Sequence, residues 1–214
     1  MKLSKIKVAA LTAILLIVID QIVKFYVKIH FYLGESVDVT SWFKILFIEN
    51  NGMAFGMELG SKLLLTVARI LIVGLLIWYL WKIRRAENLK WGYVITLSLI
   101  IGGAIGNIID CVFYGVIFNN PMPPEIARFM PDGGGYAPLL MGKVVDMLYF
   151  PLFSFVWPEW MPFVGGEEFL FFEPVFNIAD AGVSVGIILL LIAYTSQISE
   201  VRIPVKNGSS ETDA

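Results

Sequence analysis

Four long apolar stretches dominate the pattern of hydrophobic and polar positions along the chain. A helix that crosses the hydrocarbon core of a bilayer needs about 20 mostly apolar residues. Four segments meet this requirement, at residues 8–26, 63–81, 91–111 and 175–197. The pattern therefore predicts four transmembrane helices in a single membrane domain over residues 1–200, followed by a cytoplasmic tail at 201–214.

Lysine and arginine residues divide the remaining segments into two groups. The segments 1–7, 82–90 and 199–214 carry nine positive residues in 32 positions, whereas the loops 28–62 and 113–174 carry five in 97. Positive residues accumulate on the cytoplasmic side of a membrane. We therefore expect both termini to be cytoplasmic and both long loops to lie outside.

The first apolar stretch follows three lysines and could be mistaken for a cleavable secretory signal. No small-x-small cleavage site follows it, and Asp20 and Lys24 come directly after its uncharged part. We therefore favour a retained span over a signal peptide.

The two outer loops have different compositions. Residues 37–40 and 42–49 alternate or concentrate β-branched and aromatic types, which predicts two or three short strands in a small sheet on the membrane surface. In the second loop, residues 118–142 are rich in proline and glycine, which break helices and strands. Residues 149–172 are dense in aromatic side chains. That segment is either an interfacial segment on the lipid headgroups or a lid over a lipid-facing site.

Composition supports an integral membrane protein and excludes several other classes. Hydrophobic residues make up 57% of the chain, charged residues 16%, and the mean hydropathy is +0.76. Soluble domains are about 45–50% apolar and about 25% charged, and disordered chains lack such apolar content. The formal net charge of −2 excludes a nucleic-acid binder that depends on basic charge, and a single cysteine excludes an intramolecular disulfide.

Ionisable and amide side chains gather at one predicted depth, near the outer leaflet. They lie in the outer half of the first span, at the outer ends of the third and fourth spans, and in the outer loop between those two. Burying such groups costs several kcal/mol, by rough estimate, unless they are paired or hydrated. The set comprises Asp20, Lys24, Asn107, Asp110, Asp146, Asn177 and Asp180.

Each of these residues also has a structural explanation when taken alone. Asp20 and Lys24 are four residues apart on one helix face and can form an ion pair. Asn177 can be the N-cap of the fourth span, and Asp110 can be a span-end residue that reaches water. Arg69, in the middle of the second span, is expected to meet a carboxylate or carbonyl groups of another helix in a structural role.

Carboxylates are the remaining candidates for catalytic groups. His30 is the only histidine and lies beyond the first span, so neither a Ser/His/Asp triad nor a Cys/His metal cluster is plausible. Two carboxylates that share a site cannot easily both ionise, which leaves an acid beside a base. Such a pair can activate water and protonate a leaving group without a metal or cofactor.

Four sequence blocks resemble those of the lipoprotein signal peptidases, also called signal peptidase II, in that family's order. They are D-x-x-x-K at 20–24, N-x-G-x-A-F at 50–55, a glycine-rich block ending in G-N-I-I-D at 102–110, and F-N-x-A-D at 176–180. Each block alone is weak, and the four in order are specific. The resemblance covers most of the chain.

The resemblance implies roles for particular residues. The catalytic pair would be Asp146, in Val144-Val145-Asp146, and Asp180. Substrate-binding or supporting roles would fall to Asp20, Lys24, Asn50, Gly52, Asn107, Asp110 and Asn177.

The resemblance also implies a substrate and a location. The substrate would be a diacylglyceryl-modified prolipoprotein, cut just before the lipidated cysteine, and globomycin would inhibit the reaction. The enzyme would lie in the bacterial cytoplasmic (inner) membrane, in contact with membrane lipid, with its site at the outer face. We expect a monomer with no metal, cofactor or nucleic acid.

Two departures from the family pattern affect this assignment. The family usually has arginine after the G-N-x-x-D aspartate, where this chain has Cys111, which we expect to be a small apolar filler. The family's third block is usually continuous, but here the segment 118–142 precedes Val144-Val145-Asp146. Asp110 is therefore an alternative first member of the pair. Asp146 is favoured because residues 142–146 closely copy the end of the family's block.

Two other functions fit parts of the pattern. A proton- or ion-coupled transporter also carries intramembrane aspartate and lysine, but it needs carboxylates along a path through both leaflets. The inner halves of the first, third and fourth predicted spans hold none. A non-catalytic membrane scaffold gives no reason for four motif blocks to meet at one depth.

Overall fold

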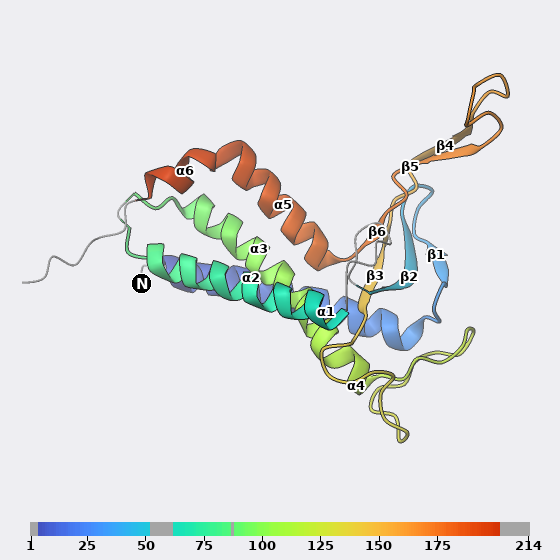
Figure 1. The fold of residues 1–214 in the computed structure, drawn as a ribbon, viewed down its shortest axis with the longest axis horizontal. Coiled ribbons are helices and arrows are strands. Elements are labelled where there is room, and N and C mark those ends of the chain that lie inside the picture. Colours follow the sequence, from blue (N-terminus) through green and yellow to red (C-terminus); the bar gives the residue numbers. More distant parts are fainter. Residues whose placement is uncertain (1–3, 52–61, 87, 202–214) are drawn as a thin grey trace, which may run out of the picture.

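The computed structural model describes residues 4–51, 62–86 and 88–201. Four apolar helices run side by side, and a small antiparallel sheet lies at one end of this bundle (Figure 1). The helices are α1 (Lys5–His30), α2 (Lys62–Ile83), α3 (Trp91–Ile109) and α5 (Ile178–Ala193). The chain thus forms a mostly helical membrane protein.

Three of the four predicted spans are long and apolar enough to cross a membrane. These are α1, α2 and the run Trp91–Ile117, in which α3 continues through a π-helical turn, η2 (Asp110–Tyr114), into α4 (Gly115–Ile117). Their outward faces carry apolar side chains such as Ile22, Leu71 and Leu75, each more than 60% exposed. Lipid is the environment that such faces require.

The prediction of one helix over residues 175–197 is wrong at both ends. Val175 and Phe176 form a strand, β6, and Asn177 caps the helix, so that α5 begins at Ile178. The helix ends at Ala193, and Tyr194 leaves the helical conformation before the short helix α6 (Thr195–Glu200). The 16 residues of α5 make it a shorter apolar helix than the other three. Because the residues at these breaks are also apolar, the sequence pattern does not reveal where the helix begins and ends.

The small sheet joins the two outer loops. Its strands are β1 (Ser36–Asp38), β2 (Lys44–Asn50), β3 (Val144–Tyr149) and β6 (Val175–Phe176), in that spatial order and all antiparallel. Two or three strands were predicted in the first loop, and the described part of that loop forms two, β1 and β2; β3 and β6 were not predicted. Ile48 lies opposite Asp146 in the register of β2 and β3, which brings the two outer loops together.

A second hairpin projects from the sheet. It pairs β4 (Phe153–Val156) with β5 (Glu168–Phe171) and extends away from the helices (Figure 1). These strands were not predicted, although aromatic residues alternate with other types at 153–156 and 168–171; the prolines and glycines between the two runs and the aromatic content of the segment favoured an interfacial segment instead. They lie within the aromatic segment 149–172.

The proline- and glycine-rich segment 118–142 contains no helix or strand, as predicted, but it is anchored. Backbone N–H groups of Gly142, Leu140 and Ala137 donate to carbonyl groups of Cys111, Val112 and Gly115, at 2.8, 3.2 and 2.9 Å. A π-helical turn leaves carbonyl groups without their usual helical partners, and turns of this kind are frequent at functional sites. The segment thus supports η2 from outside and returns the chain to β3.

Glycines of the third motif block let α3 and α5 approach closely. A Cβ atom on Gly103 would lie 2.3 Å from the carbonyl oxygen of Ala179, and one on Gly106 would lie 2.8 Å from Oδ2 of Asp20. Neither contact tolerates a methyl group without movement of the backbone or of a buried carboxylate.

We expect Gly103→Ala to lower the free energy of unfolding by about 1–3 kcal/mol, the usual cost of overpacking a tight contact. Gly74→Ala is the matched control, since a Cβ atom there meets nothing within 4 Å in the described structure. Alanine in an open helical position stabilises by about 0.5–1 kcal/mol. Thermal unfolding in detergent should therefore move the two variants in opposite directions, and equal shifts would contradict the close helix contact.

Candidate active site

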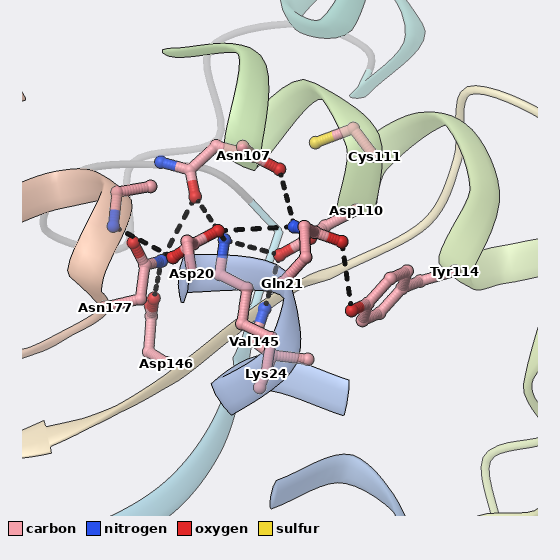
Figure 2. A network of polar contacts seen from close by, with 12 residues as sticks. Asp20, Gln21, Lys24, Asn107, Asp110, Cys111, Tyr114, Val145, Asp146 and Asn177 are labelled. Carbon is pink, nitrogen blue, oxygen red and sulfur yellow. Dashed lines mark hydrogen bonds and ion pairs between the residues drawn. The ribbon is translucent and has the colours of Figure 1, made fainter. Parts of the chain in front are cut away.

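A fully buried lysine organises the polar residues at the outer end of the bundle. Lys24 of α1 places its Nζ atom 2.9 Å from Oδ2 of Asp20, 2.9 Å from Oδ2 of Asp110 and 2.8 Å from Oδ1 of Asn107. All three donor positions of the ammonium group are thus occupied (Figure 2). Lys24 links α1 to the end of α3 and to η2.

Asp20 extends this network to α5. Its Oδ1 atom accepts a hydrogen bond from the backbone N–H of Ala179 at 2.9 Å. Helix N-termini expose N–H groups that need acceptors, and a carboxylate there is favourable. Asp20 therefore caps the first turn of α5 from another helix and fixes where that turn begins.

Asp110 extends the network to the sheet. Its Oδ2 atom accepts from the backbone N–H of Val145 at 3.2 Å, and its Oδ1 atom accepts from the side chain of Gln21 at 2.8 Å. Gln21 also donates to Asp20 and to the carbonyl oxygen of Gly106. Asp110 therefore holds the residue immediately before Asp146.

Asp180 lies in the first turn of α5 and is fixed by a capping box. The Asn177 side chain accepts from the Asp180 N–H at 2.9 Å, and the Asp180 carboxylate accepts from the Asn177 N–H at 3.4 Å. Oδ1 of Asp180 also accepts from Nδ2 of Asn107 at 2.7 Å. This reciprocal arrangement is typical of helix N-termini and fixes the side-chain direction of Asp180.

Two asparagines connect Asp180 to Asp146. Nδ2 of Asn177 donates to Oδ1 of Asp146 at 2.6 Å and to Oδ1 of Asn107 at 3.1 Å (Figure 2). Asn50, at the end of β2, donates to the other oxygen of Asp146 at 3.2 Å. Amide groups thus donate to both oxygens of Asp146 and to one oxygen of Asp180.

The two aspartates of this site have different surroundings. Burial, and after it the neighbouring Asp180 carboxylate, raise the pKa of the Asp146 carboxyl to about 7. Hydrogen bonds from Asn50 and Asn177, and the charge of Lys24, oppose that rise. Negative charge at Asp180 is favoured by the N-terminus of α5. The pair therefore offers a carboxyl group that keeps its proton near neutral pH beside a partner suited to the ionised form.

The described structure brings together eight of the nine predicted site residues. The ninth, Gly52, lies outside the described residues, together with residues 53–55 of the same motif block. The predicted Asp20–Lys24 ion pair and the Asn177 cap are both confirmed. The expectation that Asp110 reaches water is wrong, since its side chain is completely buried against Lys24.

Sequence reasoning missed two residues of the network. Gln21 bridges Asp20 and Asp110, and the Tyr114 hydroxyl donates to Oε1 of Gln21 at 3.2 Å. The signal for Gln21 was a polar residue directly after Asp20 within an apolar span. Tyr114 gave no signal, because its place depends on the π-helical turn of η2.

Cys111, at the position where the family usually has arginine, contacts a residue of α2. Cys111 is buried, as a filler would be, and Nη1 of Arg69 approaches its sulfur at 3.6 Å. The sequence led us to expect a carboxylate or carbonyl partner for Arg69, whereas this contact is with a thiol. Within residues 4–51, 62–86 and 88–201, no group of three or more His, Cys, Asp or Glu side chains could hold a metal ion.

Comparisons with known proteins agree on one family. The family model described as "Signal peptidase (SPase) II" matches residues 12–196. A lipoprotein signal peptidase of Porphyromonas gingivalis is 52% identical over 193 residues, covering 90% of this chain and 85% of the relative. One of Amoebophilus asiaticus is 36% identical over 199 residues, covering 88% and 78%.

The fold is similar to that of solved structures. One is described as a bacterial membrane enzyme determined by the in meso method at 2.3 Å resolution. It matches with a TM-score of 0.59 and 23% identity, covering 92% of this chain and 93% of that one. This similarity concerns the fold alone.

Proposed function

The chain belongs to the signal peptidase II family, and from this premise we propose that Asp146 and Asp180 are the catalytic pair of its aspartic-type peptidase activity. The activity itself, removal of signal peptides from prolipoproteins, comes with membership of the family. The pair is supported most by one observation: Asn177 and Asn107 form a continuous hydrogen-bonded link from the Asp146 carboxyl to the Asp180 carboxylate.

The proposed reaction uses Asp180 as base and Asp146 as acid. Asp180 removes a proton from a water molecule as its oxygen attacks the scissile carbonyl carbon, and Asp146 donates its proton to the carbonyl oxygen. The tetrahedral intermediate then collapses: the carbon–nitrogen bond breaks, Asp180 passes its proton to the leaving amine, and Asp146 regains its own. The products are a carboxylic acid and an amine, and water is consumed.

Asp20, Lys24 and Asp110 have positioning roles in this proposal. They hold the start of α5 and the N–H group of Val145, so that the elements carrying Asp180 and Asp146 keep a fixed separation. Asn50, Asn107 and Asn177 orient the carboxyl groups and stabilise negative charge on them. Gly52, which lies outside the described residues, keeps the supporting role that the resemblance implies.

We propose the following membrane topology. The site lies at the outer face of the bacterial cytoplasmic membrane, both termini lie inside, and α5 with α6 makes the fourth crossing. The charge distribution between the loops supports this orientation. Trp78, Trp81 and Trp91, each about half exposed, lie near the opposite end of the bundle, as residues of an aromatic belt would. Asp20, Asp110 and Asp180 gather at one end, and a transporter would need carboxylates along a path through both leaflets.

The substrate that we propose is a prolipoprotein whose cysteine carries a diacylglyceryl group, with the cut just before that cysteine. The acyl chains can remain in lipid, so the enzyme needs to admit only the peptide. The test uses purified enzyme in detergent with the modified prolipoprotein and with its unmodified form. Mass spectrometry should find a product that begins with the lipidated cysteine, from the modified form only. No cleavage by folded enzyme would overturn the proposal and favour the transporter.

The pH dependence follows from the raised pKa of Asp146. Above about pH 7 the Asp146 carboxyl loses its proton and the pair no longer contains an acid. We expect kcat/KM to fall about tenfold for each further pH unit, as a single required proton dictates. In Asn50→Ala the carboxylate loses a stabilising hydrogen bond, so this fall should shift to higher pH. A rate that keeps rising through about pH 9 would contradict the role of Asp146 as acid.

A further inference from the structure

The hairpin of β4 and β5, with its loops, forms an arm that the catalytic site does not use. We define the aromatic arm as residues 152–172. It extends away from the helices beyond the four-stranded sheet (Figure 1). Its hydrogen-bonded ladder joins β4 only to β5, with Phe153 opposite Phe171 and Phe155 opposite Phe169. The arm is therefore held to the rest of the described chain through its two ends.

One face of the arm consists of four phenylalanines. Residues that lie opposite each other or two positions apart project from the same face of a hairpin, and this relation joins Phe153, Phe155, Phe169 and Phe171. Their rings pack in two pairs, with centroids 4.8 and 5.1 Å apart. Trp157 also packs against Phe155 and Phe169, with centroids 4.7 and 5.7 Å away. The four rings nevertheless remain between 36% and 53% exposed. Contiguous exposed apolar side chains of this kind are typical of interaction sites.

A row of ring contacts connects the arm to the catalytic site. Phe172, at the end of the arm, contacts Phe176 with centroids 6.1 Å apart, and Phe150, two residues before the arm, contacts Phe176 at 5.7 Å. Phe176 directly precedes Asn177, which donates to Asp146. The base of the arm is thus packed one residue from the site.

The charge of the arm is uniformly negative. Glu159, Glu167 and Glu168 are exposed, and Glu173 follows directly, whereas no lysine or arginine occurs between residues 144 and 201. This charge disfavours a lipid surface as the occupant, because interfacial segments use basic residues to meet lipid phosphates.

We propose that the aromatic arm binds the first part of the mature polypeptide, the residues that follow the lipidated cysteine, and prefers segments that alternate apolar with basic side chains. This inference rests on the proposed function, which fixes the cysteine at the membrane surface. The mature polypeptide is then the part of the substrate that must leave the site at the sheet end of the bundle, from which the arm also projects (Figure 1). An extended peptide can place apolar side chains and lysine or arginine over the exposed rings, and the negative charge of the arm attracts its lysines and arginines.

The test compares three lipid-modified substrates with one signal peptide and one cleavage site. The first ends a few residues after the cysteine, the second continues with alternating phenylalanine and lysine, and the third continues for the same length with serine and aspartate. The enzymes are the wild type, the double variant Phe155→Ser/Phe169→Ser, and Glu167→Lys/Glu168→Lys. All four positions are exposed, which favours retention of the fold.

We expect the wild type to have a KM for the Phe/Lys substrate about tenfold below that for the Ser/Asp substrate, from one or two ring contacts and charge pairs. Both variants should raise the KM for the Phe/Lys substrate about tenfold, with kcat unchanged. Cleavage of the short substrate should be the same for all three enzymes, which also reports that the variants fold.

Equal KM values of the wild type for the two long substrates would overturn the proposal, and so would variants whose KM for the Phe/Lys substrate is unchanged. Cleavage of the short substrate would in either case uphold the proposed function. Failure of the wild type to cut even the short substrate would overturn both. A photoreactive phenylalanine at position 169 should crosslink to the mature segment, and one at Ser154, on the opposite face, should not. Crosslinks to lipid or to a second copy of the chain would instead overturn the proposal.

Discussion

Replacement of Asp180 by asparagine should reduce cleavage of lipid-modified prolipoprotein by about a hundredfold to ten-thousandfold, because general acid–base catalysis by one group contributes about 10²–10⁴. Asparagine keeps the size of the side chain, and its single acceptor oxygen can keep the hydrogen bond from Asn107, which is the shorter of the two that Asp180 accepts from Asn107 and from the N–H of Asn177. It cannot take a proton from water. The fold should therefore survive while the reaction stops.

Asp132→Asn is the matched control for this loss. Asp132 is exposed in the segment 118–142, away from the polar network, so the same chemical change there should leave the rate unaltered. Product mass gives the rate, and thermal unfolding in detergent checks that both variants are folded. Asp180→Asn activity above a few per cent of wild type would remove Asp180 from the catalytic pair.

Lys24→Met should have the largest effect on stability. Lys24 neutralises two completely buried carboxylates, Asp20 and Asp110, and breaking a buried ion pair by removing one partner costs about 3–5 kcal/mol. The free energy of unfolding should therefore fall by about this amount. Adding Asp110→Asn removes one of the uncompensated charges and should restore part of the loss.

Lys7→Met serves as the control, since Lys7 is exposed near the start of α1 and should change stability by no more than about 0.5 kcal/mol. Denaturant unfolding in detergent micelles measures all three variants. A loss below about 1 kcal/mol for Lys24→Met would mean that this network is hydrated rather than buried and paired.

The parts of the fold that depend on local sequence were predictable. An apolar run of about 20 residues requires a membrane span wherever it occurs, so α1, α2 and α3 were expected close to where they lie. The spacing of Asp20 and Lys24, and of Asn177 and Asp180, fixes an ion pair and a capping box within one helix turn. These features need no knowledge of the rest of the chain.

Other features depend on contacts between distant segments and could not be predicted. That Lys24 also meets Asp110 and Asn107 follows from the close approach of α1 and α3. The position of Asp146 depends on hydrogen bonds from N–H groups of residues 137–142 to carbonyl groups of η2 and α4. The start of α5 was misplaced because Val175 and Phe176 are as apolar as the helix that follows. The placement of Asp146 beside Asn177 rested on the family resemblance until the structure supplied the geometry.

The central claim is that Asp146, and not Asp110, acts with Asp180. The most direct measurement follows cleavage of the lipid-modified prolipoprotein by Asp146→Asn and by Asp110→Asn in parallel, with the folding of each checked by thermal unfolding. Asp110 touches Lys24, Gln21 and the N–H of Val145, which is a positioning role. We predict no detectable product from Asp146→Asn and a reduced but measurable rate from Asp110→Asn. Product from Asp146→Asn together with none from folded Asp110→Asn would contradict the account and assign the catalytic role to Asp110.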